Sequence, residues 1–347
     1  MTRDDSLSIE QIARYAIKKR IPFQVTIELL NMCNFRCIHC YLPEHNCKGL
    51  EFDTVMDIFR QLRELGTFRI NLTGGEIFLR KDIMEIIRIA REMGFSVTLL
   101  SNASLITDDI AKELAELHIA GFSTTVFSLD EHLNDTITAT TNSLSAVMNG
   151  ANLLKQYGVP VQIKTPLMKM NKFEYRQLIP FCKEHGFQYS SSPVILSKTD
   201  GDKSPTSLRM DNSDLLTVLV EAGEDYSREE YDESELPCPS IRNTLSIDCF
   251  GNVFPCNSFY YKVGNIYENN LAYIWNESEA YKRLNAITNA DLTQCKKCDI
   301  KEFCERCPGK ALSEDGDLLG CSSMDRCTAL LAKKIYESKQ NGCGVRP

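Results

Sequence analysis

Long apolar stretches are missing from this chain of 347 residues. No segment approaches the roughly 20 consecutive apolar residues that a membrane-spanning helix requires. The first residues, MTRDDSLSIEQ, carry three acidic side chains and no apolar run, so they do not resemble a secretory signal. We therefore expect a cytoplasmic protein with no membrane partner.

An excess of basic charge is missing as well. The formal net charge is −8, which argues against nucleic acid as the main partner because phosphate neutralisation requires a basic face. Internal repeats and low-complexity tracts are also lacking. The contents of 43% hydrophobic and 25% charged residues are ordinary for a globular protein, and the length suffices for one large domain and one smaller one.

Cysteine, by contrast, is abundant. The chain has 15 cysteines, of which three lie between residues 33 and 40 and nine between residues 238 and 327. A framework of disulfides is typical of small exported proteins, and this chain is neither small nor expected to be exported. Metal ligation is the interpretation that explains both the number and the clustering of these residues.

The first cluster has the spacing C-x3-C-x2-C, formed by Cys33, Cys37 and Cys40. Cysteine-ligated [4Fe–4S] clusters normally take four thiolates, so a loop with three leaves one iron open to a non-protein ligand. From the triad alone, a zinc site or unrelated reactive thiols remain the alternative.

This triad resembles that of the radical S-adenosylmethionine (radical SAM) superfamily, and the resemblance covers about residues 20–225. In that family S-adenosylmethionine chelates the open iron through its amino and carboxylate groups. Its reductive cleavage gives methionine and a 5′-deoxyadenosyl radical. The resemblance therefore implies an enzyme whose cofactors are S-adenosylmethionine and a [4Fe–4S] cluster.

Apolar runs alternate with helical periodicity between residues 24 and 225. Strands are expected at 25–30, 68–72, 96–100, 123–128, 159–164 and 189–196, and helices at 54–65, 83–90, 144–156, 173–185 and 214–222. Alternating units predict an α/β fold with a parallel sheet and outer helices. Periodicity alone also fits a doubly wound sheet, whereas the resemblance implies a partial, TIM-like (β/α)6 barrel.

Three segments follow from these patterns. Residues 1–23 are predicted to be an N-terminal helical segment, residues 24–230 the barrel, and residues 231–347 a cysteine-rich domain that ends in a helix and tail. The acidic stretch 224–235 is predicted to be a loop or linker. Beyond Pro237, turns and cysteines are expected to replace helical periodicity.

Polar residues follow the expected strands at the edge where the chemistry of a parallel barrel gathers. A Gly-Gly pair lets the backbone approach a ligand closely, and a neighbouring carboxylate can hold an amine. The resemblance implies that Gly74, Gly75 and Glu76 bind the amino group of S-adenosylmethionine. It places Ser101, Asn102 and Ser128 at ribose and methionine contacts, and His39 near the adenine. Helix caps, turns and a solvent-facing histidine are the alternatives for these four residues.

The second group of cysteines begins with Cys238 and a G-x4-C unit from Gly251 to Cys256. A run C-x2-C-x5-C-x2-C follows, and two single cysteines come after it. The pattern resembles the SPASM extension of radical SAM enzymes, which holds two auxiliary [4Fe–4S] clusters; here two residues rather than three separate Cys304 from Cys307. The alternative is a pair of four-cysteine zinc sites.

The resemblance also implies a ligand set for each auxiliary cluster, which brings the expected number of [4Fe–4S] clusters to three. The first set is Cys238, Cys256 and Cys307. The second is Cys295, Cys298, Cys304 and Cys327, with Cys327 preferred to Cys321. Cys249 or Cys321 completes the first set, or one iron stays open for substrate. Cys47, Cys182 and Cys343 have no evident partner.

The function implied is hydrogen abstraction from a ribosomally synthesised peptide, which receives a thioether or carbon–carbon cross-link. An external donor such as flavodoxin or ferredoxin would supply electrons. Formylglycine formation on a sulfatase is an alternative, but Asn257 stands where the proposed base of those enzymes is an aspartate. Peptide epimerisation with Cys47 or Cys182 as hydrogen donor, and small-molecule dehydrogenation, are further alternatives. The non-enzyme alternative is an electron carrier or a zinc-binding module.

Overall fold

The computed structural model describes residues 9–47, 49–223 and 226–341. Within them one sheet has the strand order β6-β5-β4-β3-β2-β1-β7-β8-β9. The first six strands are parallel, and each lies beside its neighbour in sequence: β1 Gln24–Glu28, β2 Arg69–Thr73, β3 Ser96–Leu100, β4 Gly121–Thr125, β5 Val161–Pro166 and β6 Gln188–Ser192. A doubly wound sheet reverses its strand order, and this one does not. The predicted partial barrel is thereby confirmed.

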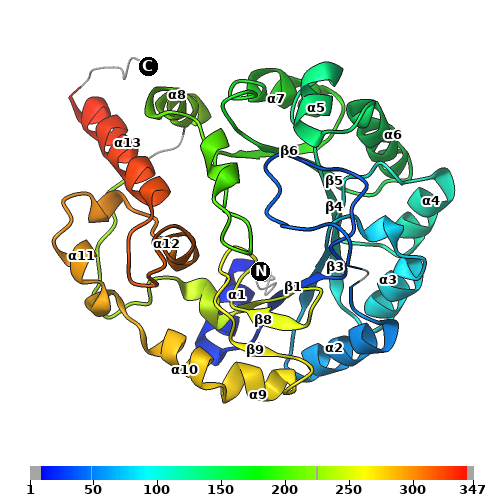
Figure 1. Cartoon of the computed structure of the whole chain (residues 1–347), viewed down its shortest axis with the longest axis horizontal. Helices are drawn as coiled ribbons and strands as arrows, with labels where there is room; N and C mark the ends of the chain where they lie inside the picture. Colours follow the sequence, from blue (N-terminus) through cyan, green and yellow to red (C-terminus); the bar gives the residue numbers. More distant parts are fainter. Residues whose placement is uncertain (1–8, 48, 224–225, 342–347) are drawn as a thin grey trace, which may run out of the picture.

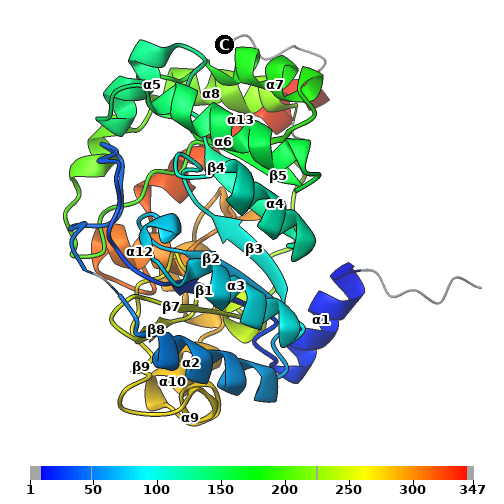
Figure 2. The ribbon, with the colours of Figure 1, turned by 90° about the vertical axis from the view of Figure 1, so that its right-hand side faces the viewer.

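Helices cover the outer face of this sheet (Figures 1 and 2). They are α2 Phe52–Glu64, α3 Ile83–Glu92, α4 Asp108–Glu116, α5 Glu131–Thr138, α6 Ser143–Gln156 and α7 Tyr175–Glu184. Four residues of α3 recur on one face and are all buried: Ile83, Ile86, Ile87 and Ala90. Burial of this apolar face against the sheet fixes the position of the helix. The sequence pattern had not predicted α4 and α5.

The two faces of the barrel strands differ in polarity. Val25, Ile27, Val97 and Leu99 are buried in the core under the helices. Their neighbours along each strand face the lumen, where the Asn71 amide donates to the Thr26 hydroxyl across 3.2 Å. The barrel therefore has an apolar outer layer that holds it together and a polar lumen.

The sheet continues into the C-terminal part of the chain. Strand β7 Thr244–Ile247 pairs in parallel with β1, and β8 Asn252–Phe254 and β9 Gly264–Asn265 follow antiparallel. The domain boundary near residue 230 stays a prediction. Strands from both sides of that residue belong to one sheet, so the sheet itself does not mark a boundary there.

Helices also form beyond Pro237. They are α9 Leu271–Asn276, α10 Glu279–Ala286, α11 Thr293–Lys296, α12 Pro308–Asp315 and α13 Ser323–Gln340. The expectation that turns replace helices there was wrong for α9, α10 and α12, which are too short to give a clear periodic signal. Helix α13 packs against α8 Asn212–Ala222 through Leu215, Leu219, Met324 and Ile335 (Figure 1).

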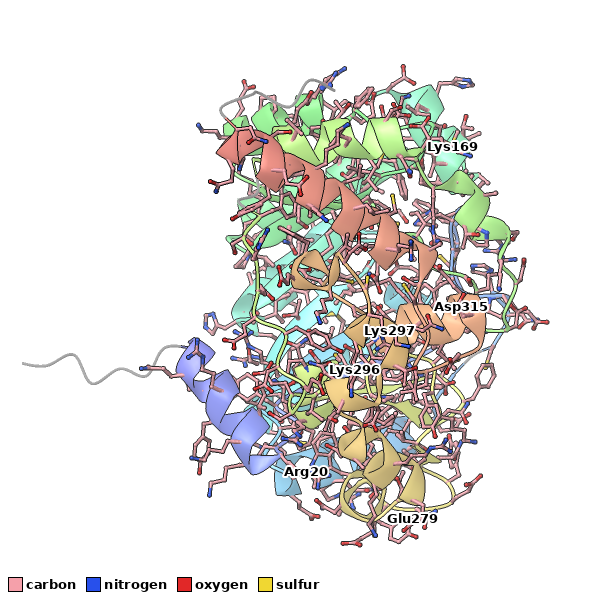
Figure 3. The ribbon with its side chains drawn as sticks, turned by 90° about the vertical axis from the view of Figure 1, so that its left-hand side faces the viewer. Arg20, Lys169, Glu279, Lys296, Lys297 and Asp315 are labelled. Atoms are coloured by element: carbon pink, nitrogen blue, oxygen red, sulfur yellow. The ribbon has the colours of Figure 1, made fainter. Side chains whose placement is uncertain are left out.

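The N-terminal helix α1, Ile9–Lys19, lies near the amino end of β1. Arg20, labelled in Figure 3, donates to the Trp275 carbonyl, and the Trp275 indole donates to the Arg20 carbonyl. These bonds fasten the N-terminal segment to α9, at the edge of the sheet opposite the strand ends that carry chemistry. No helix among the described residues is long and apolar enough to cross a membrane.

Candidate active site and cysteine clusters

A cavity of about 250 Å³ opens at the carboxyl ends of the barrel strands. Cys33, Cys37 and Cys40 all line it, on the loop that follows β1. The loop is fixed from outside, because the Arg36 and Ile38 amides each donate to a carbonyl at the end of α5 across 3.0 Å. The structure therefore brings the predicted triad to one wall of one cavity.

Burial raises the pKa of Cys33 to about 11 and that of Cys37 to about 12, and the thiols repel one another's negative charge. A positively charged metal centre relieves both effects, since thiolates are the ligating form.

The spacing of the ligands bears on the zinc alternative. Among the described residues, no three Cys, His, Asp or Glu side chains converge on a point suited to a single ion. A structural zinc requires such convergence, whereas an iron–sulfur cluster takes one cysteine per iron and its ligands stand farther apart. The donor set therefore fits a cluster better than zinc.

The Gly-Gly pair lies against the start of the cysteine loop. The Gly75 amide donates to the Leu30 carbonyl (2.9 Å) and the Glu76 amide to the Met32 carbonyl (2.7 Å). A Cβ on Gly75 would lie 2.2 Å from the Met32 carbonyl oxygen, and one on Gly74 would lie 2.3 Å from that of Leu30. Both positions require glycine because of this close approach, and both residues line the cavity.

Glu76 lies behind the cavity wall rather than in it. Its side chain is fully buried and accepts hydrogen bonds from the Ser101 hydroxyl (2.8 Å) and from the Asn102 and Phe78 amides (2.8 and 2.9 Å). Burial raises its pKa, and these donors counteract the shift. The carboxylate thus positions Ser101 and Asn102, which do line the cavity. Its predicted contact with the cofactor amine stays a prediction.

The other two predicted cofactor contacts differ in their placement. Ser128 does not line the cavity; its hydroxyl accepts from the Asp130 amide (2.9 Å) and donates to Glu174 (2.5 Å), as in a turn. His39 does line it, with its ring edge against Phe127 at 5.0 Å between centroids. Burial lowers the pKa of His39 to about 4, so the ring is neutral at physiological pH.

A second cavity, of about 340 Å³, lies in the C-terminal part. Cys295, Cys298, Cys304 and Cys321 line it, and Cys238 lies on its wall as well. Cys327 lines a different cavity, where its thiol donates to the Asn212 side-chain oxygen (2.9 Å). The structure therefore groups Cys321, and not the predicted Cys327, with the other three. The physical reason is that Cys327 lies within α13, facing α8, while Cys321 lies in the loop before that helix.

Arg306 and Asp325 hold this loop in place, and no sequence motif predicts this role for either residue. The Arg306 guanidinium donates to the carbonyls of Leu318 (2.6 Å) and Gly320 (2.8 Å), directly before Cys321. The buried Asp325 accepts from the Cys307 amide (2.9 Å) and pairs with Lys310. The cysteines are thus oriented by a charged scaffold around them.

The remaining predicted set, Cys238, Cys256 and Cys307, also lies together. Burial chiefly raises the pKa of Cys256, and the neighbouring Cys238 and Cys307 thiols add to the rise. Cys249 lies elsewhere: its pKa is raised by burial and by an adjacent Cys47. Cys238 also lines the second cavity, so this set lies directly beside the other one. With Cys321 assigned to Cys295, Cys298 and Cys304, three cysteines of the described residues remain for this set. Cys343 lies outside the described residues.

Neither thiol proposed as a hydrogen donor lines the cavity. Cys182 is 1% exposed, on the buried face of α7. Cys47 lies beside Asn31, whose side chain accepts from its amide (2.5 Å). Asn257 is adjacent to Cys256, and the two side chains are within 3.3 Å. Asn257 supplies no carboxylate, which leaves the formylglycine alternative without its base.

Sequence reasoning missed two ionisable residues at the site, Glu28 on β1 and Lys164 on β5. The Tyr41 hydroxyl, on the cavity wall, donates to the buried Glu28 (2.6 Å), and burial raises the pKa of Glu28 to about 7. Such a carboxyl can take up and release a proton near neutral pH. Lys164 lines the cavity from β5. Strand alternation was the available signal, since Glu28 and Lys164 occupy lumen-facing positions toward the ends of their strands.

The fold, the cysteine triad and the second cysteine cavity define an iron–sulfur enzyme of the partial-barrel type. Residues 27–182 match the model of the radical SAM superfamily, and residues 238–308 match that of the SPASM iron–sulfur cluster-binding domain. The chain therefore carries a radical SAM domain followed by a SPASM domain.

Curated relatives are distant in sequence but match over most of their length. The chain is 22% identical to the AdoMet-dependent heme synthase of Methanosarcina barkeri, over 86% of this chain and 94% of that protein. It is 24% identical to the PqqA peptide cyclase of Bradyrhizobium diazoefficiens, over 85% of this chain and 84% of that protein.

Solved structures share the fold. Streptococcus suis SuiB bound to its precursor peptide SuiA has a TM-score of 0.68 at 19% identity, over 94% of this chain and 84% of that one. Native anSMEcpe with bound AdoMet and the Cp18Cys peptide has a TM-score of 0.67 at 15% identity, over 92% of this chain and 99% of that one.

Proposed function

We propose that this enzyme oxidatively modifies a peptide, installing a thioether or a carbon–carbon cross-link. Two sites in one chain carry the proposal. One is the cavity at the strand ends, with its three-cysteine triad; the other is a separate cysteine-lined cavity formed by residues of the chain's second half. Similar proteins whose structures were solved with peptides, and a similar peptide cyclase, support the choice of a peptide.

The cofactors S-adenosylmethionine and three [4Fe–4S] clusters would supply the hydrogen-abstracting radical and an electron acceptor. Cys33, Cys37 and Cys40 hold the first cluster. Gly74, Gly75, Ser101 and Asn102 shape the cofactor side of the cavity. Tyr41 and Glu28 hold the proton that leaves the substrate in an oxidation, because their hydrogen bond joins the cavity wall to a carboxyl with a pKa of about 7.

For the second half of the chain we propose Cys295, Cys298, Cys304 and Cys321 as the ligands of one auxiliary cluster. Cys238, Cys256 and Cys307 serve the other, with one iron free of a cysteine ligand. An external flavodoxin or ferredoxin is the electron donor.

The test is anaerobic co-expression with a short peptide encoded beside the gene, followed by mass spectrometry. Loss of two hydrogens from the peptide, abolished by Cys33→Ala and retained in Cys182→Ala, supports the proposal. Cys182 is a matched control because it lies in the core away from the cavity. Unchanged mass with uptake of one deuterium in heavy water would instead indicate epimerisation.

A small-molecule substrate is the second candidate. The chain matches 94% of the length of a heme synthase. The corresponding shares are 84% for the PqqA peptide cyclase, 84% for SuiB and 99% for anSMEcpe. Titration of the reconstituted protein with a porphyrin separates the two candidates. A shift of the porphyrin absorption band that saturates near one equivalent favours the small molecule, and its absence favours the peptide.

A further inference from the structure

Lys164 is placed in the barrel lumen by the alternation of β5. Val161 and Ile163 are buried in the core beneath the helices. Gln162 and Lys164 therefore face the lumen, where the Ser123 hydroxyl of the neighbouring strand β4 donates to the Gln162 side-chain oxygen across 3.2 Å. Lys164 is in register with Thr125 of β4, which lines the same cavity.

The cavity carries a single fixed charge. Among its described lining residues, Lys164 is the one Lys or Arg, and none is an Asp or Glu. The permanent positive charge of the wall therefore comes from Lys164.

Lys164 also lacks a counter-ion in the described part of the chain. Three other partly buried cations have one: Lys310 pairs with Asp325, Arg209 with Glu314, and Lys172 with Asp214. The pKa of Lys164 is lowered by burial alone, with no nearby acidic group to offset the shift.

The carboxylates closest to the lumen are already engaged. Glu28 accepts from Tyr41, and Glu76 accepts from Ser101 and Asn102. Neither lines the cavity. A half-buried ammonium without a partner is costly, and an incoming anion would recover that cost.

We propose that Lys164 binds a carboxylate of the substrate, next to the group that is modified. The substrate class is then a peptide that presents an Asp or Glu side chain, or a C-terminal carboxylate, to the cavity. This inference rests on the proposed function and adds the charge of the reacting residue to it.

The cofactor is the other source of a carboxylate, and placement favours the substrate. The predicted cofactor contacts that line the cavity follow β1, β2 and β3, whereas Lys164 lies on β5. Two strand spacings separate β3 from β5, or about 10 Å at about 4.8 Å each. A cofactor held at β2 and β3 leaves Lys164 facing the space for a second ligand.

Protection of the lysine from chemical labelling tests the proposal without turnover. The anaerobically reconstituted protein is labelled with trace acetic anhydride, and acetylation of Lys164 is measured by mass spectrometry against the exposed Lys169, labelled in Figure 3. The probes are S-adenosylmethionine alone, and S-adenosylmethionine with N-acetyl-Gly-Glu-Gly-amide or with its Gln counterpart. No reductant is added.

We expect the Glu tripeptide to slow labelling of Lys164 by about threefold or more and the Gln tripeptide to leave it unchanged, because only the carboxylate pairs with the ammonium. Labelling of Lys169 should stay constant. Protection by S-adenosylmethionine alone, with nothing added by the Glu tripeptide, would assign Lys164 to the cofactor and overturn the proposal. Identical labelling with both tripeptides would overturn it as well.

Two variants give an independent measurement. Lys164→Met removes the charge at similar length, and Lys164→Arg keeps it. We expect Lys164→Met to weaken binding of the Glu tripeptide about tenfold relative to Lys164→Arg. Binding of S-adenosylmethionine, measured by dialysis, should be the same in both. Weaker cofactor binding in Lys164→Met would contradict the proposal. If the wild type fails to cleave S-adenosylmethionine with reductant, the proposed function fails; the labelling result stands or falls separately.

Discussion

The barrel and the C-terminal part of the chain position their cysteines by different means. In the barrel, Cys33, Cys37 and Cys40 lie on a loop whose Arg36 and Ile38 amides are bonded to the end of α5, with a large apolar core behind it. In the C-terminal part, Cys295, Cys298 and Cys304 lie on short helical turns, and Arg306 and Asp325 fasten the loops around them. The barrel fold should therefore persist without its cluster, whereas the C-terminal loops should depend on theirs.

The two regions differ in how much apolar surface they bury, which is the reason for this expected difference in their dependence on metal. The barrel core unites strands and helices in one cluster of buried side chains. Beyond β9, large buried residues such as Trp275 and Tyr281 belong to α9 and α10, next to the sheet. The segment from Cys295 to Cys307 contributes Ile300 as its buried apolar side chain, so we expect metal ligation to be a main source of its stability.

The largest effect is expected for Cys33→Ala. Loss of one of three protein ligands removes the cluster that binds S-adenosylmethionine, so formation of 5′-deoxyadenosine should fall to background. The far-ultraviolet circular dichroism should stay that of the wild type, because the barrel core is intact. Residual cleavage at a tenth of the wild-type rate or above would refute the assignment of the triad.

Cys321→Ala and Cys327→Ala distinguish the two candidates for the last ligand of the second auxiliary cluster. We expect Cys321→Ala to lose up to about four irons per chain and Cys327→Ala to lose none. Iron and protein are quantified after anaerobic reconstitution. The reverse pattern would restore Cys327 as the ligand.

Gly75→Ala should destabilise the fold by about 3 kcal/mol, because its methyl group meets the Met32 carbonyl at 2.2 Å. Gly121→Ala is the matched control, since the nearest atom to its Cβ is at 3.8 Å. Urea unfolding of both variants measures the difference. Equal stability would show that the two loops do not lie as close together as described.

Glu28→Gln should change the pH dependence of stability by up to about 2 kcal/mol. The pKa of Glu28 in the folded protein, about 7, is above the value of 4.5 for the free side chain. The folded state therefore binds the proton more tightly, and its stability is lost as pH rises through 7. The variant cannot ionise, so it should gain stability relative to the wild type between pH 5 and pH 8. Parallel curves for the two proteins would contradict a buried, protonatable Glu28.

The smallest effect is expected for Ser128→Ala. Its hydroxyl closes a turn outside the cavity, so the affinity for S-adenosylmethionine should change less than about twofold. Asn102→Ala, on the cavity wall, should weaken binding more. Equilibrium dialysis of both variants provides the comparison, and an equal loss of affinity would return Ser128 to the cofactor site.

Much of the barrel could be predicted from sequence because its signals are local. The apolar face of α3 and the alternation of β3 are complete within single elements. Helix α5 was missed because Asn134 and Thr138 are buried through hydrogen bonds rather than through apolar periodicity. Strand β7 was missed because it has four residues and pairs with β1 from far along the chain.

The candidate site divides in the same way. Spacing identified the cysteine triad, and the glycines were found because a close backbone approach requires that residue type. The choice between Cys321 and Cys327 depends on where α13 begins, which spacing does not encode. The proposed roles of Glu28 and Lys164 depend on their neighbours: Glu28 has a hydrogen-bond partner, and Lys164 has no counter-ion in the described part of the chain. These relations exist only in the folded barrel, so local sequence patterns do not predict them.

Formation of 5′-deoxyadenosine by Cys33→Ala and Cys304→Ala, compared with the wild type under the same reducing conditions, tests the difference between the two regions most directly. The barrel should generate the radical on its own, so Cys304→Ala should keep most of the cleavage while Cys33→Ala loses all of it. Equal loss in both variants would contradict the account, because it would mean that the barrel site depends on the C-terminal cysteines.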